Sequence, residues 1–290
     1  MSAFTIKLIA MLLMLADHIA YVGSEVMPGS LPVILMRAAG RVAFPIFAFF
    51  IVNGFYHSSD RYRYLTRLCA FAAISQLPFS LAFSFTNYTP AAYPGSALGL
   101  GCEPGLILPL LFGLSAIYFV REDSRKRLFF AAAAACLLYV FTLRLGGITL
   151  LTPPLNVYYT LALSLAVLML LEACREKPRG ERLRRLGFLA LGFLCFALVI
   201  LPRSDYGFNG LALVVLLYSC GRSRALQVLA LGIWCCMMYA PSLPMLAGAL
   251  CACPLLLLYS GRPGRRGGLG FYLFYPAHLV IIFIVFFLIR

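Results

Sequence analysis

The sequence predicts an all-α, polytopic membrane protein with about 10–11 transmembrane helices and a cytoplasmic N-terminus. Of the 290 residues, 62% are hydrophobic and only 12% are charged, which is about half the charged fraction of an ordinary soluble domain. Apolar runs of roughly 17–20 residues recur from one end of the chain to the other, and a helix needs this length to cross a bilayer. Basic residues also gather in alternate loops, as they do in membrane proteins.

About eleven apolar segments are predicted to cross the membrane. We place them near residues 4–22, 32–54, 66–85, 104–120, 128–145, 155–171, 187–201, 208–220, 225–240, 243–259 and 270–289. The segment 208–220 is short, and only a tight turn joins 225–240 to 243–259. If either of these predictions fails, the number of spans falls to nine or ten. No long polar segment remains between the spans. We therefore expect one integral-membrane domain, residues 1–290, in the cytoplasmic membrane.

The basic loops set the expected orientation. Lysine and arginine cluster at 60–67, 121–127, 175–185, 221–224 and 261–266, whereas the loops at 86–103, 146–156 and 240–244 carry almost none. With a cytoplasmic N-terminus all five basic loops fall inside and the C-terminus falls outside. Topology thus accounts for the net charge of +14. We expect the basic loops to meet anionic membrane lipid and expect no nucleic-acid partner, because a nucleic-acid surface would gather its charge on one folded face.

No metal site is expected in this chain. The ten cysteines are scattered, mostly within the spans, and none has C-x-x-C spacing or a histidine close enough in sequence to complete a zinc motif. We interpret them as apolar fillers of helix interfaces. The first apolar segment is also not expected to be a cleaved signal peptide, because it lacks a small-x-small cleavage site and contains Asp17 and His18.

Ionisable side chains inside the spans are the main functional signal, because each costs roughly 2.5–3.5 kcal/mol at the centre of a membrane helix. Asp17 and His18 fall in the outer half of the first span. Arg37 and Arg41 fall in the outer half of the second, four residues apart and so on one helix face. Consecutive residues point about 100° apart on a helix. We therefore expect Asp17 to pair with Arg41 or Arg37 and His18 to line a cavity.

The alternative interpretation is purely structural: a buried ion pair and an interhelical hydrogen bond that fix how the helices pack. The functional interpretation rests on an acid, an imidazole and two guanidinium groups at one depth. Histidine is the usual general base near neutral pH, and arginine suits a phosphate or an oxyanion. His278, in the last span, is expected nearer the cytoplasmic side. The candidate catalytic residues are His18, Asp17, Arg41, Arg37 and His278.

Other polar residues flank this cluster. His57 ends the second span beside the basic loop that holds Arg61, Arg63 and Arg67, a candidate site for an anionic cosubstrate. Gln76 precedes Pro78, and proline at 45, 78 and 276 is expected to kink three of the spans and open a cavity. The outer loop 202–208 adds Arg203, Asp205 and Tyr206.

An ordered set of segments resembles the TraX family. The set consists of LADHIA (15–20), GRVAFPIFAFFIVNGFYH (40–57), RYLTRLCAFAAISQLPFSLAF (63–83), NVYYTL (156–161), DYGFNG (205–210) and FYLFYPAHL (271–279). The most specific part is DHI followed by GR-x-x-FPIF and ISQ-x-PF. The chain departs from the family at Ala20, where glycine is typical, and at NVYYTL, where the usual form is richer in phenylalanine.

The resemblance implies a membrane acetyltransferase that takes an acetyl group from cytoplasmic acetyl-CoA. The family's namesake acetylates the N-terminal amine of a pilin subunit, and the acceptor here would be a peptide amine, a glycan or a lipid near the outer side. His18 would be the general base, with Asp17 anchoring Arg41, Arg37 or Arg41 facing the oxyanion, and His278 a second base. Coenzyme A would contact His57, Arg61, Arg63, Arg67 and Gln76, and the acceptor would contact Asp205, Tyr206 and Asn156.

Two other classes of function stay open on the sequence. The cluster of Asp17, His18 and Arg41 would also serve a proton- or anion-coupled transporter or lipid flippase. The absence of a visible sequence repeat disfavours transporters built from inverted repeats. A non-catalytic assembly protein is the third class, and only the ordinary apolar spans support it.

Overall fold

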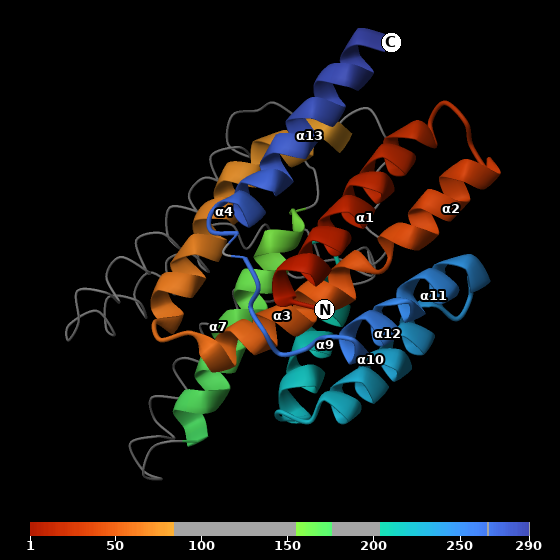
Figure 1. Ribbon diagram of the computed structural model, residues 1–290. Helices are drawn as coiled ribbons and strands as arrows, with labels where there is room; N and C mark the ends of the chain where they lie inside the picture. The colour runs from red at the N-terminus through yellow and green to blue at the C-terminus, as the bar shows by residue number, and fades with distance from the viewer. Residues whose placement is uncertain (84–154, 176–203, 266, 290) are drawn as a thin grey trace, which may run out of the picture. The chain divides into compact units, whose positions relative to one another are not determined.

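A computed structural model of the chain describes residues 1–83, 155–175, 204–265 and 267–289, and these ranges are helical, which confirms the all-α class (Figure 1). The helices are α1 (Ala3–Gly23), α2 (Leu31–Gly40), α3 (Ala43–His57), α4 (Arg61–Phe83), α7 (Val157–Arg175), α9 (Gly207–Ser219), α10 (Arg224–Tyr239), α11 (Leu243–Leu250), α12 (Ala252–Leu257) and α13 (Gly270–Ile289). Among the described residues, β-type pairing is limited to an isolated parallel bridge between Leu155 and Ser204.

Four helical segments within the described ranges are long and apolar enough to cross a membrane: Ala3–Gly23, Leu31–His57, Arg61–Phe83 and Gly270–Leu288. They coincide with the predicted spans 4–22, 32–54, 66–85 and 270–289. Shorter apolar helices at Val157–Met169, Gly207–Ser219, Arg224–Tyr239 and Leu243–Leu257 match four further predictions. The predicted spans 104–120, 128–145 and 187–201 lie outside the described residues.

Large apolar side chains are exposed on the long helices. On α1, Leu12 is 54% exposed, and on α13, Phe287 and Leu288 are 64% and 76% exposed. In water such faces would be a liability, whereas in a bilayer they meet hydrocarbon. The exposed faces therefore fit the multi-pass membrane class.

The second predicted span is two helices, which corrects the expectation of one kinked helix. After α2 ends, the N–H groups of Arg41 and Val42 donate to the carbonyls of Ala38 and Ala39, three residues back. Pro45 gives the reason, because it lies in the first turn of α3 and has no N–H to donate to the Arg41 carbonyl four residues earlier. Arg41 consequently lies at the junction. The helices α4 and α13 continue through Pro78 and Pro276.

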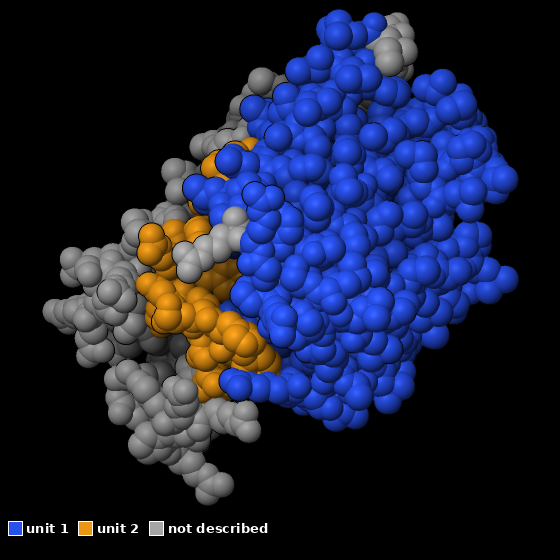
Figure 2. Space-filling model, viewed as in Figure 1, with its two compact units in different colours: residues 1–54, 77–87, 212–290 blue, residues 55–76, 88–211 orange. Residues whose placement is uncertain are grey.

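The chain forms two compact units, shown in different colours in Figure 2. The first unit contains residues 1–54, 77–87 and 212–290, and the second contains residues 55–76 and 88–211. In the first unit α1 lies between α2 and α13, and α11 packs against α2 (Figure 1). Small residues allow these close approaches, because a Cβ at Gly40 would collide with Asp17 and one at Gly248 with the Ala38 carbonyl.

Candidate functional site

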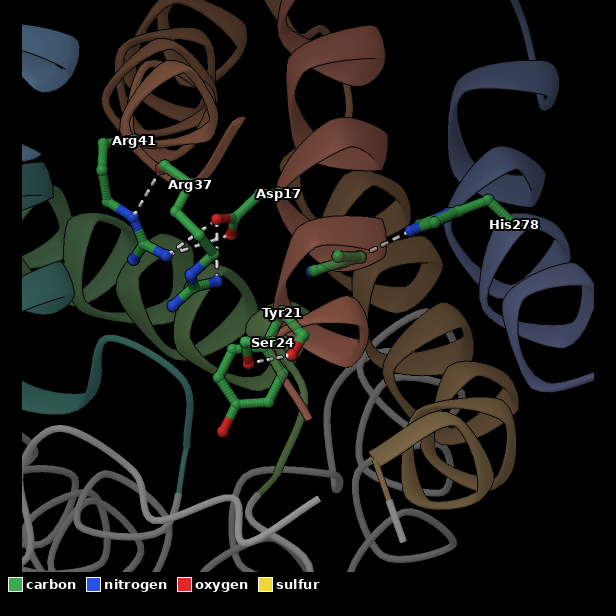
Figure 3. A network of polar contacts seen from close by, with 7 residues as sticks. Asp17, Tyr21, Ser24, Arg37, Arg41 and His278 are labelled. Carbon is green, nitrogen blue, oxygen red and sulfur yellow. Dashed lines mark hydrogen bonds and ion pairs between the residues drawn. The ribbon is translucent and has the colours of Figure 1, made fainter. Parts of the chain in front are cut away.

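An ion-pair cluster joins α1 to α2 and holds Asp17 between two arginines (Figure 3). Asp17 Oδ1 accepts from Nη1 of Arg37 at 2.8 Å and from Nη2 of Arg41 at 2.9 Å, and Asp17 Oδ2 accepts from the same Nη2 at 3.1 Å. The three side chains are only 12–24% exposed. The predicted pairing of Asp17 with Arg41 or Arg37 is therefore confirmed for both arginines.

Within the described residues of this cluster, two guanidinium groups face the Asp17 carboxylate. Arg37 also lies over the ring of Tyr21, with its guanidinium carbon 4.6 Å from the ring centroid, and Arg41 Nε donates to the Arg37 carbonyl at 3.3 Å. Ser24 Oγ donates to the Tyr21 carbonyl at 2.5 Å, where α1 ends. A half-buried guanidinium group suits a phosphate, a carboxylate or a developing oxyanion.

Gly40 is the residue that lets the carboxylate reach both arginines. We predict that Gly40→Ala separates α1 from α2, because the new Cβ would occupy the place of the Asp17 side chain. Such overpacking costs about 1–3 kcal/mol and should lower both thermal stability in detergent and activity. Gly23→Ala is the matched control, since nothing lies within 4 Å of its Cβ position. Equal melting temperatures for the two variants would contradict this account of Gly40.

The next residue, His18, faces α13, on the side of α1 that is opposite α2. Its Nδ1 lies 2.7 Å from Nε2 of His278 on α13, and both side chains are buried. The two imidazole planes are within 6° of each other and their centroids are 5.0 Å apart. Because the contacting nitrogens are much closer than the centroids, the rings meet edge to edge, in the geometry of a hydrogen bond between ring nitrogens.

Aromatic side chains surround this histidine pair. Phe83 and Tyr275 present edges to His18 at centroid distances of 5.5 and 6.0 Å. Phe274 stacks on His278, and its carbonyl accepts from Nδ1 of His278 at 2.8 Å. The sequence places His278 nearer the cytoplasmic side, which stays a prediction, and the structure adds that His278 contacts His18. The helices α1 and α13 run in the same direction, with Phe4 beside Phe271 and His18 beside His278.

Other predicted site residues belong to the second unit and form their own contacts. Asn156 Nδ2 donates to Gln76 Oε1 at 2.9 Å and to the Ala72 carbonyl at 2.8 Å, and the Asn156 N–H also donates to Gln76 Oε1. Both amides are fully or almost fully buried. The sequence does not predict this pairing, because it assigns Gln76 to coenzyme A and Asn156 to the acceptor. Asn156 donates twice to the Gln76 side-chain oxygen, so the simplest role of the pair is to join α4 to the start of α7.

The predicted acceptor residues Asp205 and Tyr206 lie just before α9. The Asp205 N–H donates to the Leu155 carbonyl at 2.8 Å, and its own carbonyl accepts from Thr160 Oγ1. Tyr206 has φ of +62°, a left-handed conformation that is uncommon for a bulky residue. Such conformations cost of order 1–3 kcal/mol and tend to occur at functional sites. Arg203 lies outside the described residues.

The basic residues predicted to bind coenzyme A lie around the end of α3 and the start of α4. Arg61 is occupied locally, with its guanidinium carbon 4.1 Å from the Phe55 ring centroid and its Nε donating to the Phe55 carbonyl. His57, Arg63 and Arg67 are exposed. Gln76 is fifteen residues along α4 from Arg61, about 22 Å at 1.5 Å per residue, so it does not belong with this basic group.

Sequence reasoning missed two residues of the first unit that take part in cation–π contacts. Tyr21 follows Asp17 by one helical turn, and this i, i+4 spacing could have placed it beside Arg37. Lys7 is an ionisable residue inside the first span, and its Nζ lies 4.7 Å from the Phe50 ring centroid and 5.8 Å from that of Phe271. Within the described ranges, no group of three or more His, Cys, Asp or Glu side chains could hold a metal ion.

A family model and a curated bacterial protein match this chain. The model of a family described as "TraX protein" matches residues 2–149 and 98–286. The probable fimbrial assembly protein FimC, serogroup H1, of Dichelobacter nodosus is 37% identical over 90 residues, which are 31% of this chain and 36% of that protein. The match thus spans about a third of the relative's length. No solved structure shows significant similarity to the chain.

Proposed function

Because the chain belongs to the TraX family, we propose that it is a membrane-embedded acetyltransferase that uses acetyl-CoA. In this proposal the acetyl group passes from a cytoplasmic donor to an amine or hydroxyl near the outer side of the cytoplasmic membrane. The N-terminal amine of a pilin-like membrane peptide is the favoured acceptor. The family's link with pilin acetylation and the similarity to a probable fimbrial assembly protein support this choice over a glycan or a lipid.

The observation that carries the proposal is the arrangement of polar groups around α1. The carboxylate of Asp17 and two guanidinium groups lie on one side of the helix, and the His18–His278 pair lies on the other. Each polar group placed inside an apolar helix assembly costs free energy, so a cluster of them favours a functional role. Acyl transfer needs a general base and an anion-binding group, and α1 holds both of them in place.

The proposed reaction assigns each group one step. His18 accepts a proton from the acceptor amine or hydroxyl as its nitrogen or oxygen attacks the thioester carbonyl. Arg37 or Arg41 stabilises the oxyanion of the tetrahedral intermediate, and Asp17 holds both arginines in place. Collapse of the intermediate breaks the carbon–sulfur bond and releases coenzyme A. The thiolate takes the proton from His18, which regenerates the free base.

The donor is expected at the exposed basic residues at the start of α4. We predict that Arg63→Gln combined with Arg67→Gln raises the KM for acetyl-CoA about 10-fold with kcat little changed, because phosphate contacts contribute to binding and not to the chemical step. The matched control is Arg262→Gln with Arg265→Gln, which removes the same charge from another exposed basic loop. An equal rise in KM for both double variants would indicate general electrostatic attraction instead of a site.

Radiolabelled acetyl-CoA tests the proposed function directly. Purified protein in detergent should bind it saturably at micromolar concentration and release free coenzyme A slowly, and more quickly when a pilin-like amine is added. A transporter or flippase that used the same charged cluster would instead move a proton or an anion across proteoliposomes without consuming the thioester. Absence of binding together with such transport would replace the proposal with that alternative.

A further inference from the structure

We propose that His278 is a positioning residue that fixes the tautomer of His18, so that Nε2 of His18 carries the lone pair that accepts the proton. This inference rests on the proposed function for its catalytic meaning, although the tautomer itself can be measured without any activity. It also changes the role of His278, which the sequence suggested as a second base.

The first step is the contact between His278 and its own helix. Nδ1 of His278 lies 2.8 Å from the Phe274 carbonyl, one turn back along α13. A carbonyl oxygen can only accept a hydrogen bond, so Nδ1 must carry the proton. Neutral imidazole has one N–H and one lone pair. Nε2 of neutral His278 is therefore an acceptor.

The second step passes this assignment to His18. The acceptor Nε2 of His278 lies 2.7 Å from Nδ1 of His18, and the two rings are nearly coplanar, so Nδ1 must donate. The donor is assigned from the hydrogen-bond network, as is usual for histidine. Neutral His18 then keeps its lone pair on Nε2. Among the residues that the structure describes, this nitrogen has no hydrogen-bond partner.

The third step concerns what His18 gains from this arrangement. In many catalytic sites a carboxylate accepts a hydrogen bond from one ring nitrogen of the catalytic histidine. This bond fixes both the tautomer and the orientation of the imidazole. Asp17 cannot do this for His18, because it is bound to Arg37 and Arg41 on the other side of α1. The neutral His278 takes that place. When His18 accepts a proton on Nε2, its Nδ1–H remains bonded to His278 without rearrangement.

Nitrogen NMR provides the decisive experiment. The chain has three histidines, so protein labelled with ¹⁵N-histidine gives few ring signals, and His57→Gln and His278→Gln assign them. We expect His18 to show a protonated Nδ1 and an unprotonated Nε2, and His278 to show the same pattern. A protonated Nε2 on neutral His18 would overturn the proposal.

Variants at position 278 test the link between the tautomer and the reaction. His278→Leu removes the acceptor, so His18 should shift toward the Nε2–H form, and kcat should fall about 10- to 100-fold with the KM for acetyl-CoA unchanged. His278→Gln can still present an acceptor oxygen, and it should restore much of the Nδ1–H tautomer of His18 and much of kcat. A normal tautomer and a normal kcat in His278→Leu would refute the positioning role. If the wild-type tautomer is as expected but no acetyl transfer occurs, the proposed function fails and the tautomer assignment stands.

Discussion

Replacement of His18 by alanine is expected to abolish acetyl transfer while acetyl-CoA binding persists. A general base contributes about 10²- to 10⁴-fold to a rate. His18 suits that role, because its Nδ1 contacts His278 and its Nε2 has no hydrogen-bond partner among the described residues. The measurement is the rate of acetyl transfer to an amine acceptor, compared with the binding of radiolabelled acetyl-CoA. We expect kcat to fall at least 100-fold and the dissociation constant to change little.

A second variant separates chemistry from packing. His18→Gln keeps a polar group of similar size that can still donate to His278, but an amide is not a base. If His18 is the base, both variants lose transfer, while His18→Gln stays close to wild type in thermal stability. If His18 only fixes the packing of α1 against α13, His18→Gln should retain most of the activity. Wild-type turnover in either variant would therefore rule out the assigned role.

The sequence was sufficient for features that depend on local composition. Apolar length located the long helices, and the rule that a buried charge needs a partner paired Asp17 with the arginines. The break at Arg41 could also have been predicted, because Pro45 cannot donate to the carbonyl four residues earlier. Reading the span as one kinked helix gave too little weight to that missing hydrogen bond.

Contacts between distant segments were harder to predict. His18 and His278 are 260 residues apart, and nothing in either segment states that α1 and α13 are neighbours. The contact between Gln76 and Asn156 was equally hard to predict, because the sequence does not show that each amide has the other as a partner. In both cases the individual residue was identified and its role was not, because the role depends on which helices pack together.

The second large effect is expected at Asp17, where Asp17→Leu should destabilise the protein by about 3–5 kcal/mol. Removing the carboxylate leaves two guanidinium groups largely buried without their shared partner, since their side chains are only 24% and 15% exposed. The loss can be measured as the fraction folded during denaturant or thermal titration in detergent. Activity should fall as well, because neither arginine would keep its position.

The triple variant Asp17→Leu, Arg37→Met, Arg41→Met then decides why the cluster exists. Buried ion-pair networks replaced by apolar residues of similar volume often keep or gain stability, so the triple variant should recover what Asp17→Leu alone loses. If the cluster serves only to hold α1 against α2, a refolded triple variant should also recover activity. If an arginine faces the oxyanion, stability returns and acetyl transfer does not. Recovery of both would assign the cluster to packing and leave His18 to act with some other oxyanion-binding group.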